Sequence, residues 1–593
     1  MVSAEDQSSG RLRDAIALVA AVAAPTLLAF NWPPSPTLLN QCLAIGLWGA
    51  TLSCAAFRIS SLEPRQLVRD NWALCITLVV IALGTVVALG RSGSPMPIAL
   101  GALGVLGAAG LVLWFGTAAA HDHEPAGLFA WFLWALVGAG VVSGLIACLQ
   151  VFTPEWPDGE LIARSGLPGR AVGNLRQPNH LSSLLLWSLI GAVGLHELRR
   201  LDRRAAVTLS AMFVFGLVLS GSRTGALGCL VLAGWGLLDR RLSRPVRALL
   251  LATPLLFALV WVGMSGWSHA SERSFGGESR LSLQSGGDIS SSRFAIWSNA
   301  WVMLGREPLS GVGFGEFNLA WTLSAFPDRP IAFFDHTHNL PLQLAVELGL
   351  PLAALIVGLL AIAMVQAWRR AWRSDGDLGV AKRTAFMIVL MIALHSQLEY
   401  PLWYAYFLLP TAFAWGFALA GQRGEPTSTP TPRGIQPSRW PVAVGLTMTL
   451  GAAAALMDYR GVVVIYAPPD DAAPLDERIA RGQRSPLFAH HADYAAATAF
   501  GEPKAPLSPS QTLAFRRAPH HLLDVRLMIA WAQALAAQGE VDKARWLAAR
   551  IREFRNPGSD EFFAPCAQPV GAAQAFQCQA PHRTYNWREF TRT

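Results

Sequence analysis

The chain has 593 residues, of which 52% are hydrophobic and 15% charged, and its mean hydropathy is +0.36. This composition is too apolar for a soluble protein of that length. It therefore indicates a polytopic membrane protein. The formal net charge of +8 does not indicate a nucleic-acid partner, because the arginines fall in short clusters between apolar runs, where they set membrane orientation.

Apolar runs of membrane-helix length recur along the chain. Backbone groups cannot stay unpaired in lipid, and the runs show no alternation of polar and apolar residues, so the spans must be helices. We therefore expect an all-α polytopic membrane protein with about 13 transmembrane helices. The predicted spans are residues 15–30, 38–57, 72–89, 97–119, 128–152, 181–195, 205–220, 226–238, 248–266, 340–368, 385–396, 402–420 and 441–457.

Arginine and lysine cluster in alternate loops between these runs. By the positive-inside rule these loops are cytoplasmic, as is the N-terminus, and the remaining loops and the C-terminal region are periplasmic. The expected parts are an N-terminal transmembrane bundle (1–266), a periplasmic catalytic loop (267–339), further transmembrane helices (340–457) and a periplasmic helical domain (458–593).

Several arginines lie on the predicted outer side, where the positive-inside rule gives no reason for them. Arg223 occupies a short turn between two spans, Arg293 begins an amphipathic helix predicted over 293–304, and Arg176 lies in the loop before residue 180. Guanidinium groups bind phosphate through two parallel hydrogen bonds, so these three could hold a lipid-linked diphosphate. For Arg164 and Arg170 we expect snorkelling to lipid headgroups instead.

A pair of histidines ends the long outer loop. His338 is predicted to be a general base, because an imidazole titrates near neutral pH and lies here where the loop meets an apolar run. Asp335 or Asn339 could orient its ring. A metal site made by His336, His338 and Asp335 is the weaker hypothesis, because this spacing lacks a further defined ligand, so we expect no metal.

The C-terminal region carries two further patterns. Cys566 and Cys578 are the cysteines outside the apolar runs, and they should form a disulfide if this region faces an oxidising compartment. Residues 520–537 and 540–554 predict a helical hairpin that resembles a tetratricopeptide unit and either binds a partner or docks as a cap. Its predicted buried stripe is Leu523, Leu527, Ala530, Trp531, Ala534 and Leu535, faced by Ala544, Leu547, Ala548 and Ile551.

Several motifs together resemble a known family. Three parts of the sequence resemble the O-antigen ligase superfamily. They are the run 334–339 (FDHTHN) with 347–351 (ELGLP), the turn 222–225 (SRTG), and the helix from Arg293 leading to the glycine turn 311–315 (GVGFG). The glycine turn alone, with no strand before it, is weak evidence for a nucleotide site. Two more specific stretches, 173–181 (GNLRQPNHL) and 395–406 (HSQLEYPLWYAY), are similar to bacterial protein O-oligosaccharyltransferases, the pilin glycosylation ligases.

The resemblance implies a metal-independent, cofactor-free enzyme of the bacterial inner membrane. It would move an oligosaccharide en bloc from undecaprenyl diphosphate to a Ser or Thr of a periplasmic protein such as type IV pilin. The undecaprenyl chain of the donor would lie in the membrane lipid. His338 would be the essential histidine, and Arg223 and Arg293 would match the arginines at the diphosphate. Expected supporting contacts are Gln177, Asn179, His180, Asp335, His336, Asn339, Glu399, Tyr400 and Tyr404, with Tyr400 and Tyr406 competing for the role of Tyr404.

Two other functions compete with this interpretation. Within the superfamily, the protein could be an O-antigen ligase acting on lipid A core or an O-antigen polymerase. From another class, it could be a transporter or flippase for lipid-linked sugar, which predicts charged residues inside several spans and related halves. Apart from His395 and Glu399 the runs are almost free of charge and show no repeat, which favours the enzyme.

Overall fold

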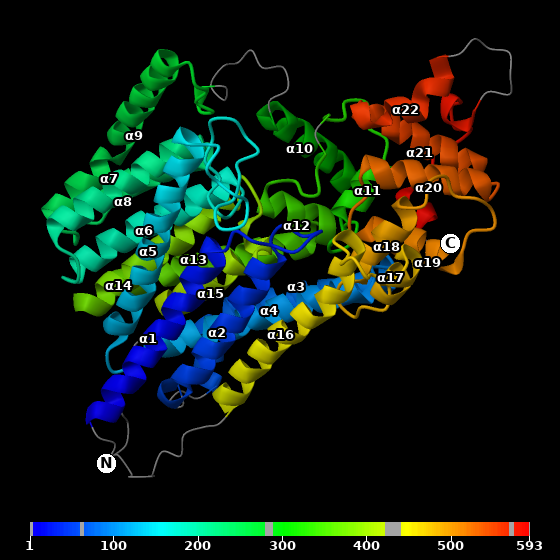
Figure 1. The fold of residues 1–593 in the computed structure, drawn as a ribbon. Coiled ribbons are helices and arrows are strands. Elements are labelled where there is room, and N and C mark those ends of the chain that lie inside the picture. Colours follow the sequence, from blue (N-terminus) through cyan, green and yellow to red (C-terminus); the bar gives the residue numbers. More distant parts are fainter. Residues whose placement is uncertain are drawn as a thin grey trace. The chain divides into compact units, whose positions relative to one another are not determined.

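The computed structural model describes residues 4–59, 64–278, 289–331, 333–421, 440–567 and 575–591. Within these ranges every regular element is a helix and no strand occurs (Figure 1). The expected all-α fold is therefore confirmed. Its physical reason is that a helix pairs its own backbone groups where lipid offers no partners.

Nine helices among the described residues are long and apolar enough to cross a membrane. A multi-pass membrane protein is thus confirmed, but the count of thirteen spans stays a prediction, because α8 and α15, with 16 and 15 residues, are shorter than a full span. The nine are α2 (Leu38–Ile59), α3 (Pro64–Arg91), α4 (Met96–Ala119), α5 (Pro125–Phe152), α7 (Arg203–Ser220), α9 (Arg244–Ser271), α13 (Leu350–Arg373), α14 (Gly376–His395) and α16 (Trp440–Tyr466). The other helices that overlap predicted spans are α1 (Ala4–Leu27), α6 (Pro178–Glu197), α8 (Arg223–Leu238), α12 (Leu340–Leu348) and α15 (Ala405–Leu419).

The span expected over 340–368 is wrong as a single helix. Gly349 divides it into α12 and α13. This residue has φ +80°, and a Cβ atom there would collide with the backbone of Leu309, so only glycine fits. The short helix α12 is thereby separated from the apolar span that follows it.

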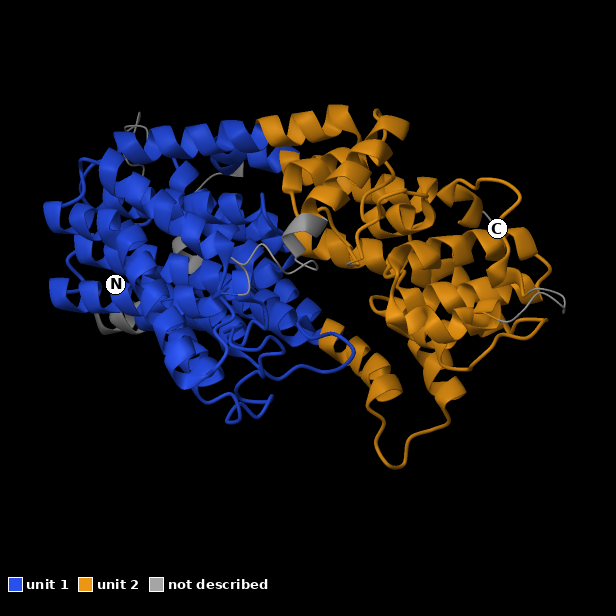
Figure 2. Ribbon diagram, turned by 90° about the horizontal axis from the view of Figure 1, so that it is seen from above, with its two compact units in different colours: residues 1–76, 107–286, 359–454 blue, residues 77–106, 287–358, 455–593 orange. Residues whose placement is uncertain are grey.

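The chain forms two compact units, coloured separately in Figure 2. Unit 1 comprises residues 1–76, 107–286 and 359–454, and unit 2 comprises residues 77–106, 287–358 and 455–593. The four-part division expected from the sequence stays a prediction.

Unit 1 is a bundle of apolar helices around buried aromatic rings. The rings of Trp48 and Phe413, for example, are buried with centroids 5.4 Å apart. Gly116 lets α4 approach α15 closely, since a Cβ atom there would collide with the carbonyl group of Phe413. Helix α6 is buried along most of its length, so packing fixes the position of the residues at its N-terminus.

In unit 2 the C-terminal region packs on the short helix α11 (Phe317–Leu323) and the residue before it. The Nδ1 atom of His520 lies 2.8 Å from Oε2 of Glu316, and both side chains are buried. The backbone N–H of Leu523 donates to Oδ1 of Asn318 at 2.8 Å. The C-terminal region is therefore docked on the polar segment before α12.

The predicted helical hairpin is present as α20 (Val525–Ala537) and α21 (Val541–Phe554). The first helix begins later than predicted, because Asp524 caps it by accepting from the N–H of Leu527 at 2.9 Å. Every residue of the predicted stripe is buried, whereas the likeness to a tetratricopeptide unit stays a prediction. The region also contains α17 (Leu475–Gly482), α18 (Ala489–Thr498), α19 (Pro509–Arg517) and α22 (Asp560–Phe563).

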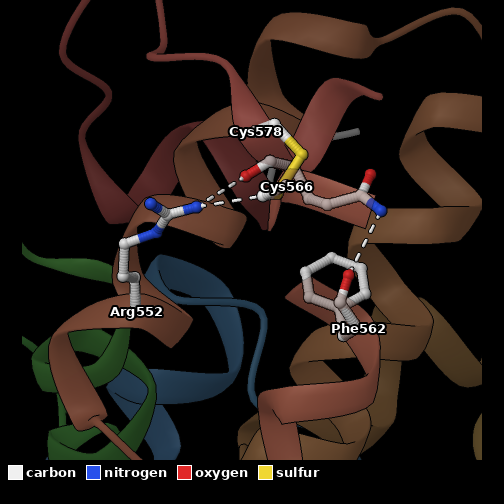
Figure 3. The surroundings of a disulfide bond; sticks show 5 residues. Arg552, Phe562, Cys566 and Cys578 are labelled. Carbon is white, nitrogen blue, oxygen red and sulfur yellow. Dashed lines mark hydrogen bonds between the residues drawn. A yellow bond between two sulfur atoms is a disulfide. The ribbon is translucent and has the colours of Figure 1, made fainter. Parts of the chain in front are cut away.

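Cys566 and Cys578 are joined by a disulfide, with Cα atoms 5.2 Å apart (Figure 3). The guanidinium group of Arg552 on α21 donates to the carbonyl oxygen of Gln577 at 3.3 Å. The side chain of Gln577 donates to the carbonyl oxygen of Phe562 at 3.2 Å. The disulfide and these bonds fasten the end of the chain to α21 and α22.

Candidate active site

The loop that carries His338 is held from two directions within unit 2. The indole Nε1–H of Trp297, on α10 (Ile289–Arg306), donates to the carbonyl oxygen of Thr337 at 2.8 Å. The N–H of Thr337 donates to Oε1 of Gln343 on α12, also at 2.8 Å. His338 has φ +54°, a left-handed conformation that costs a side-chain-bearing residue about 1–2 kcal/mol. The bonds to Thr337 help to maintain this strained conformation.

The imidazole of His338 remains partly accessible. It stands edge-on to the buried ring of Phe334, with ring centroids 5.3 Å apart. A partly accessible imidazole on a fixed backbone is compatible with the predicted general base, and that role stays a prediction.

The two residues predicted to orient His338 have other contacts as well. Oδ1 of Asp335 lies 3.1 Å from Nδ1 of His336, and Oδ1 of Asn339 caps α12 by accepting from the N–H of Leu342 at 3.0 Å. Burial alone would raise the pKa of Asp335, but the imidazoles of His336 and His338 outweigh it and lower that pKa. Asp335 is therefore an anion at neutral pH, and which residue orients His338 stays a prediction.

Arg293 lies on the helix that supports this loop. The predicted helix over 293–304 is observed as α10, a few residues longer at its start. Arg293 is half-buried and precedes Trp297 by four positions, which places both on one helix face. The Trp297–Thr337 bond therefore joins the face of α10 that carries Arg293 to the loop of His338.

Glu347 was not among the predicted site residues. It is buried on α12, and its Oε1 accepts from Nε2 of Gln343 at 2.9 Å. Burial raises the pKa of Glu347 to about 7, although His336 opposes the shift. Gln343 thus connects Glu347 to Thr337, the neighbour of His338. The available signal was a carboxylate inside an apolar stretch, where a charge is costly.

The glycine turn over 311–315 packs against the end of α12. The N–H groups of Val312 and Gly313 donate to the carbonyl oxygens of Val346 and Glu347, each at 2.9 Å. A Cβ atom at Gly311 would collide with the Glu347 carbonyl group. The glycines in this turn therefore permit close backbone packing.

A second cluster of predicted residues lies in unit 1, at the N-terminus of α6. Nδ2 of Asn179 donates to Oε1 of Glu399 at 2.8 Å, and Oδ1 of Asn179 accepts from the hydroxyl of Ser222 at 2.6 Å. Oε1 of Gln177 caps α6 by accepting from the N–H of His180 at 2.7 Å. Asn179 thus connects three separate segments of the chain.

The competing tyrosines differ in burial. Tyr406 is buried, and its hydroxyl lies 3.2 Å from Nδ1 of His180. The ring of Tyr404 stands edge-on to His180 with centroids 4.6 Å apart, and Tyr400 stacks on Tyr404. Both Tyr400 and Tyr404 are partly accessible. Tyr406 therefore contacts His180 in the interior, whereas a ligand-binding role for Tyr400 or Tyr404 stays a prediction.

The two arginines of this cluster are placed differently. Arg223 is exposed and is the first residue of α8, directly after its N-cap Ser222. The positive end of that helix dipole adds to its charge, which favours an anion nearby. Arg176 donates to the carbonyl oxygens of Pro36 and Gly159, each at 3.4 Å. A diphosphate-binding role for either stays a prediction.

Snorkelling is wrong for Arg170. Its side chain is buried, and it donates from Nε to the carbonyl oxygen of Ser220 at 3.0 Å and from Nη2 to that of Gly221 at 3.4 Å. These carbonyls end α7, where a cation is favourable. Arg170 therefore stabilises the turn that precedes Arg223. Arg164 donates to the carbonyl oxygen of Pro157 at 2.9 Å.

The structure thus brings the predicted residues together in two groups, each within one unit. The group in unit 1 is Arg176, Gln177, Asn179, His180, Arg223, Glu399, Tyr400 and Tyr404. The group in unit 2 is Arg293, Asp335, His336, His338 and Asn339. The fold and these groups define a polytopic membrane protein with polar and cationic clusters beside its apolar helices.

Three protein-family models match consecutive parts of the chain. The O-antigen ligase family matches residues 208–357, the protein glycosylation ligase family residues 171–196, and the C-terminal family of virulence factor membrane-bound polymerases residues 384–563. Parts of the chain are thus similar to the O-antigen ligase and protein glycosylation ligase families, the resemblance that its motifs predicted.

Two curated relatives come from Acinetobacter baylyi (strain ATCC 33305 / BD413 / ADP1). A general O-oligosaccharyltransferase is 27% identical over 335 residues, which are 52% of this chain and 54% of the relative. A ComP-specific O-oligosaccharyltransferase is 26% identical over 296 residues, which are 48% of this chain and 50% of the relative. The chain spans about half the length of these relatives.

Proposed function

We propose that this protein is an O-linked oligosaccharyltransferase of the bacterial inner membrane. It moves a glycan en bloc from undecaprenyl diphosphate to a Ser or Thr of a periplasmic protein such as a pilin, and needs neither metal nor cofactor for the transfer. The observation that carries the proposal is His338, an accessible imidazole in a left-handed loop anchored by Trp297 and Gln343. The similarity to two O-oligosaccharyltransferases supports it.

The chemistry assigns complementary roles to the two groups. The acceptor hydroxyl oxygen attacks the anomeric carbon, the bond from that carbon to the diphosphate oxygen breaks, and the hydroxyl proton passes to His338. Arg223, Arg293 and Arg176 bind the departing undecaprenyl diphosphate and stabilise its negative charge. In this proposal the N-terminus is cytoplasmic, and the C-terminal region and the transfer step are periplasmic.

The decisive variant is His338→Asn. Asparagine tolerates a left-handed backbone better than alanine does, so this change removes the base with little backbone strain. General-base catalysis contributes about 10²–10⁴-fold, and we expect transfer to fall by about that factor. The measurement is the mass of pilin from cells in which the variant reaches normal membrane levels.

The control is His123→Asn, which changes an exposed imidazole outside both groups and should leave pilin glycosylation intact. Glycosylated pilin with loss of surface O-antigen in the His338 variant would replace this proposal with ligation to lipid A core. Loss of glycan translocation with transfer intact in isolated membranes would replace it with a flippase.

A further inference from the structure

Three histidines converge in the C-terminal region of unit 2. His490 and His491 lie in the first turn of α18, and His521 follows the short helix η3 (Ala518–His520). One ring nitrogen of each lies within 4.8 Å of those of the other two. The ring centroids of His490 and His521 are only 4.1 Å apart, and those of His490 and His491 are 4.3 Å apart. Among the described residues, no other group of three or more His, Cys, Asp or Glu side chains lies close enough together to bind one metal ion.

The environment of the rings favours metal ligation over stacking alone. His490 is buried, and its Nδ1 atom has no hydrogen-bond partner among the described residues. A buried polar atom normally has a partner. A metal ion bound at this atom would give it a partner, because a ring nitrogen of histidine is a common metal ligand.

The surroundings of the three histidines also suit a bound ion. They hold the backbone of His491, leave His521 accessible to solvent and partly neutralise a nearby cation. The hydroxyl of Tyr466 donates to the carbonyl oxygen of His491 at 2.6 Å. Much of His521 is open to solvent. The carboxylate of Asp335 is close enough to His521 to favour a positive charge there. Arg517, a nearby cation, is paired with Asp493 at 2.9 Å, so its repulsion of a bound ion is reduced.

From this geometry we propose that His490, His491 and His521 bind one divalent transition-metal ion of the imidazole-preferring class, such as Zn²⁺. Because the three nitrogens lie within 4.8 Å of one another, an ion equidistant from them would lie at most about 2.8 Å from each, against about 2.0–2.1 Å in zinc sites. A shift of each imidazole towards the ion by less than about 1 Å would bring its nitrogen to the usual zinc distance. The ion would join α18 to the segment before α20, beside Asp335 of the His338 loop. It has no part in the transfer step.

The test uses the full-length protein in detergent with an affinity tag that contains no histidine. The protein is stripped with a chelator, given Zn²⁺ alone, dialysed and assayed for zinc by elemental analysis. We expect about one zinc per chain, a higher melting temperature with zinc, and a visible absorption band with Co²⁺. His490→Gln and His521→Gln should each reduce bound zinc at least tenfold, whereas His582→Gln, at an exposed histidine, should not.

Wild-type protein that retains no zinc after dialysis would overturn the proposal, and so would equal retention by the His490→Gln/His521→Gln double variant. The wild-type result stands even if a variant fails to fold. His338→Asn should retain zinc, so failure of the transferase proposal and failure of the metal site are distinguishable.

Discussion

At the scale of single residues, the candidate site depends on side chains whose backbone or burial is unusual. His338 adopts a left-handed conformation, and Glu347 is a carboxyl group enclosed by protein. Both features cost free energy, and such costs concentrate at functional sites. These residues therefore provide sharp tests.

Replacement of Arg223 by lysine should impair transfer by at least about tenfold. The positive charge is kept, but a lysine ammonium cannot form the planar two-bond fork with a diphosphate. The measurement is the rate of glycan transfer in isolated membranes with equal protein levels. Arg204→Lys, at another exposed arginine near a helix start, is the control. Wild-type turnover in the Arg223 variant would contradict bidentate diphosphate binding.

Glu347 should make stability depend on pH. Its pKa is raised to about 7 by burial, from an ordinary value of 4.5, so the fold favours the protonated form. The resulting cost is absent below about pH 4.5, grows as pH rises towards 7 and then levels off, at a magnitude on the order of 3 kcal/mol. Glu347→Gln removes the titration, so the melting temperature of the variant should fall less between pH 5 and pH 8.

Thermal unfolding in detergent at several pH values measures this difference. Glu561→Gln, at an exposed glutamate, should keep the wild-type pH profile. A Glu347→Gln profile parallel to the wild type would show that this carboxyl group is not the source of the pH dependence.

At the scale of elements, α10 and α12 together hold the loop of His338. Trp297 reaches it from one helix and Gln343 from the other, while the glycine turn packs beneath the end of α12. The apolar run over 340–368 concealed this arrangement, because hydropathy alone does not mark the break at Gly349.

Gly349→Ala should destabilise the protein by about 2 kcal/mol or more. The φ of +80° disfavours a side chain, and the added methyl group would collide with the Leu309 backbone. Thermal unfolding and glycan transfer should both decline. Gly358→Ala, in α13 with open space around its Cβ position, should be neutral or stabilising by about 0.5–1 kcal/mol. Equal stability of the two variants would contradict a structural break at Gly349.

At the scale of the whole molecule, the C-terminal region is part of unit 2 together with the His338 loop. The buried Glu316–His520 pair and the Asn318–Leu523 bond join segments about 200 residues apart. The sequence indicated a helical hairpin there, and its buried stripe is as expected, but it gave no sign of the surface on which the region docks. Docking depends on shape and partner groups that periodicity within one helix does not encode.

The sequence by itself determined the all-helical membrane architecture and the kinds of chemistry available, because composition, run length and residue type are local properties. Motifs also indicated the similarity to the O-antigen ligase family, whose model matches residues 208–357. Only the tertiary structure decided that Asn179 bridges Glu399 and Ser222, that Tyr406 contacts His180, and that Gln343 links Glu347 to the loop of His338. The Asn179–Glu399 and Tyr406–His180 partners are more than 200 residues apart, and contacts at that separation arise from how helices pack against one another.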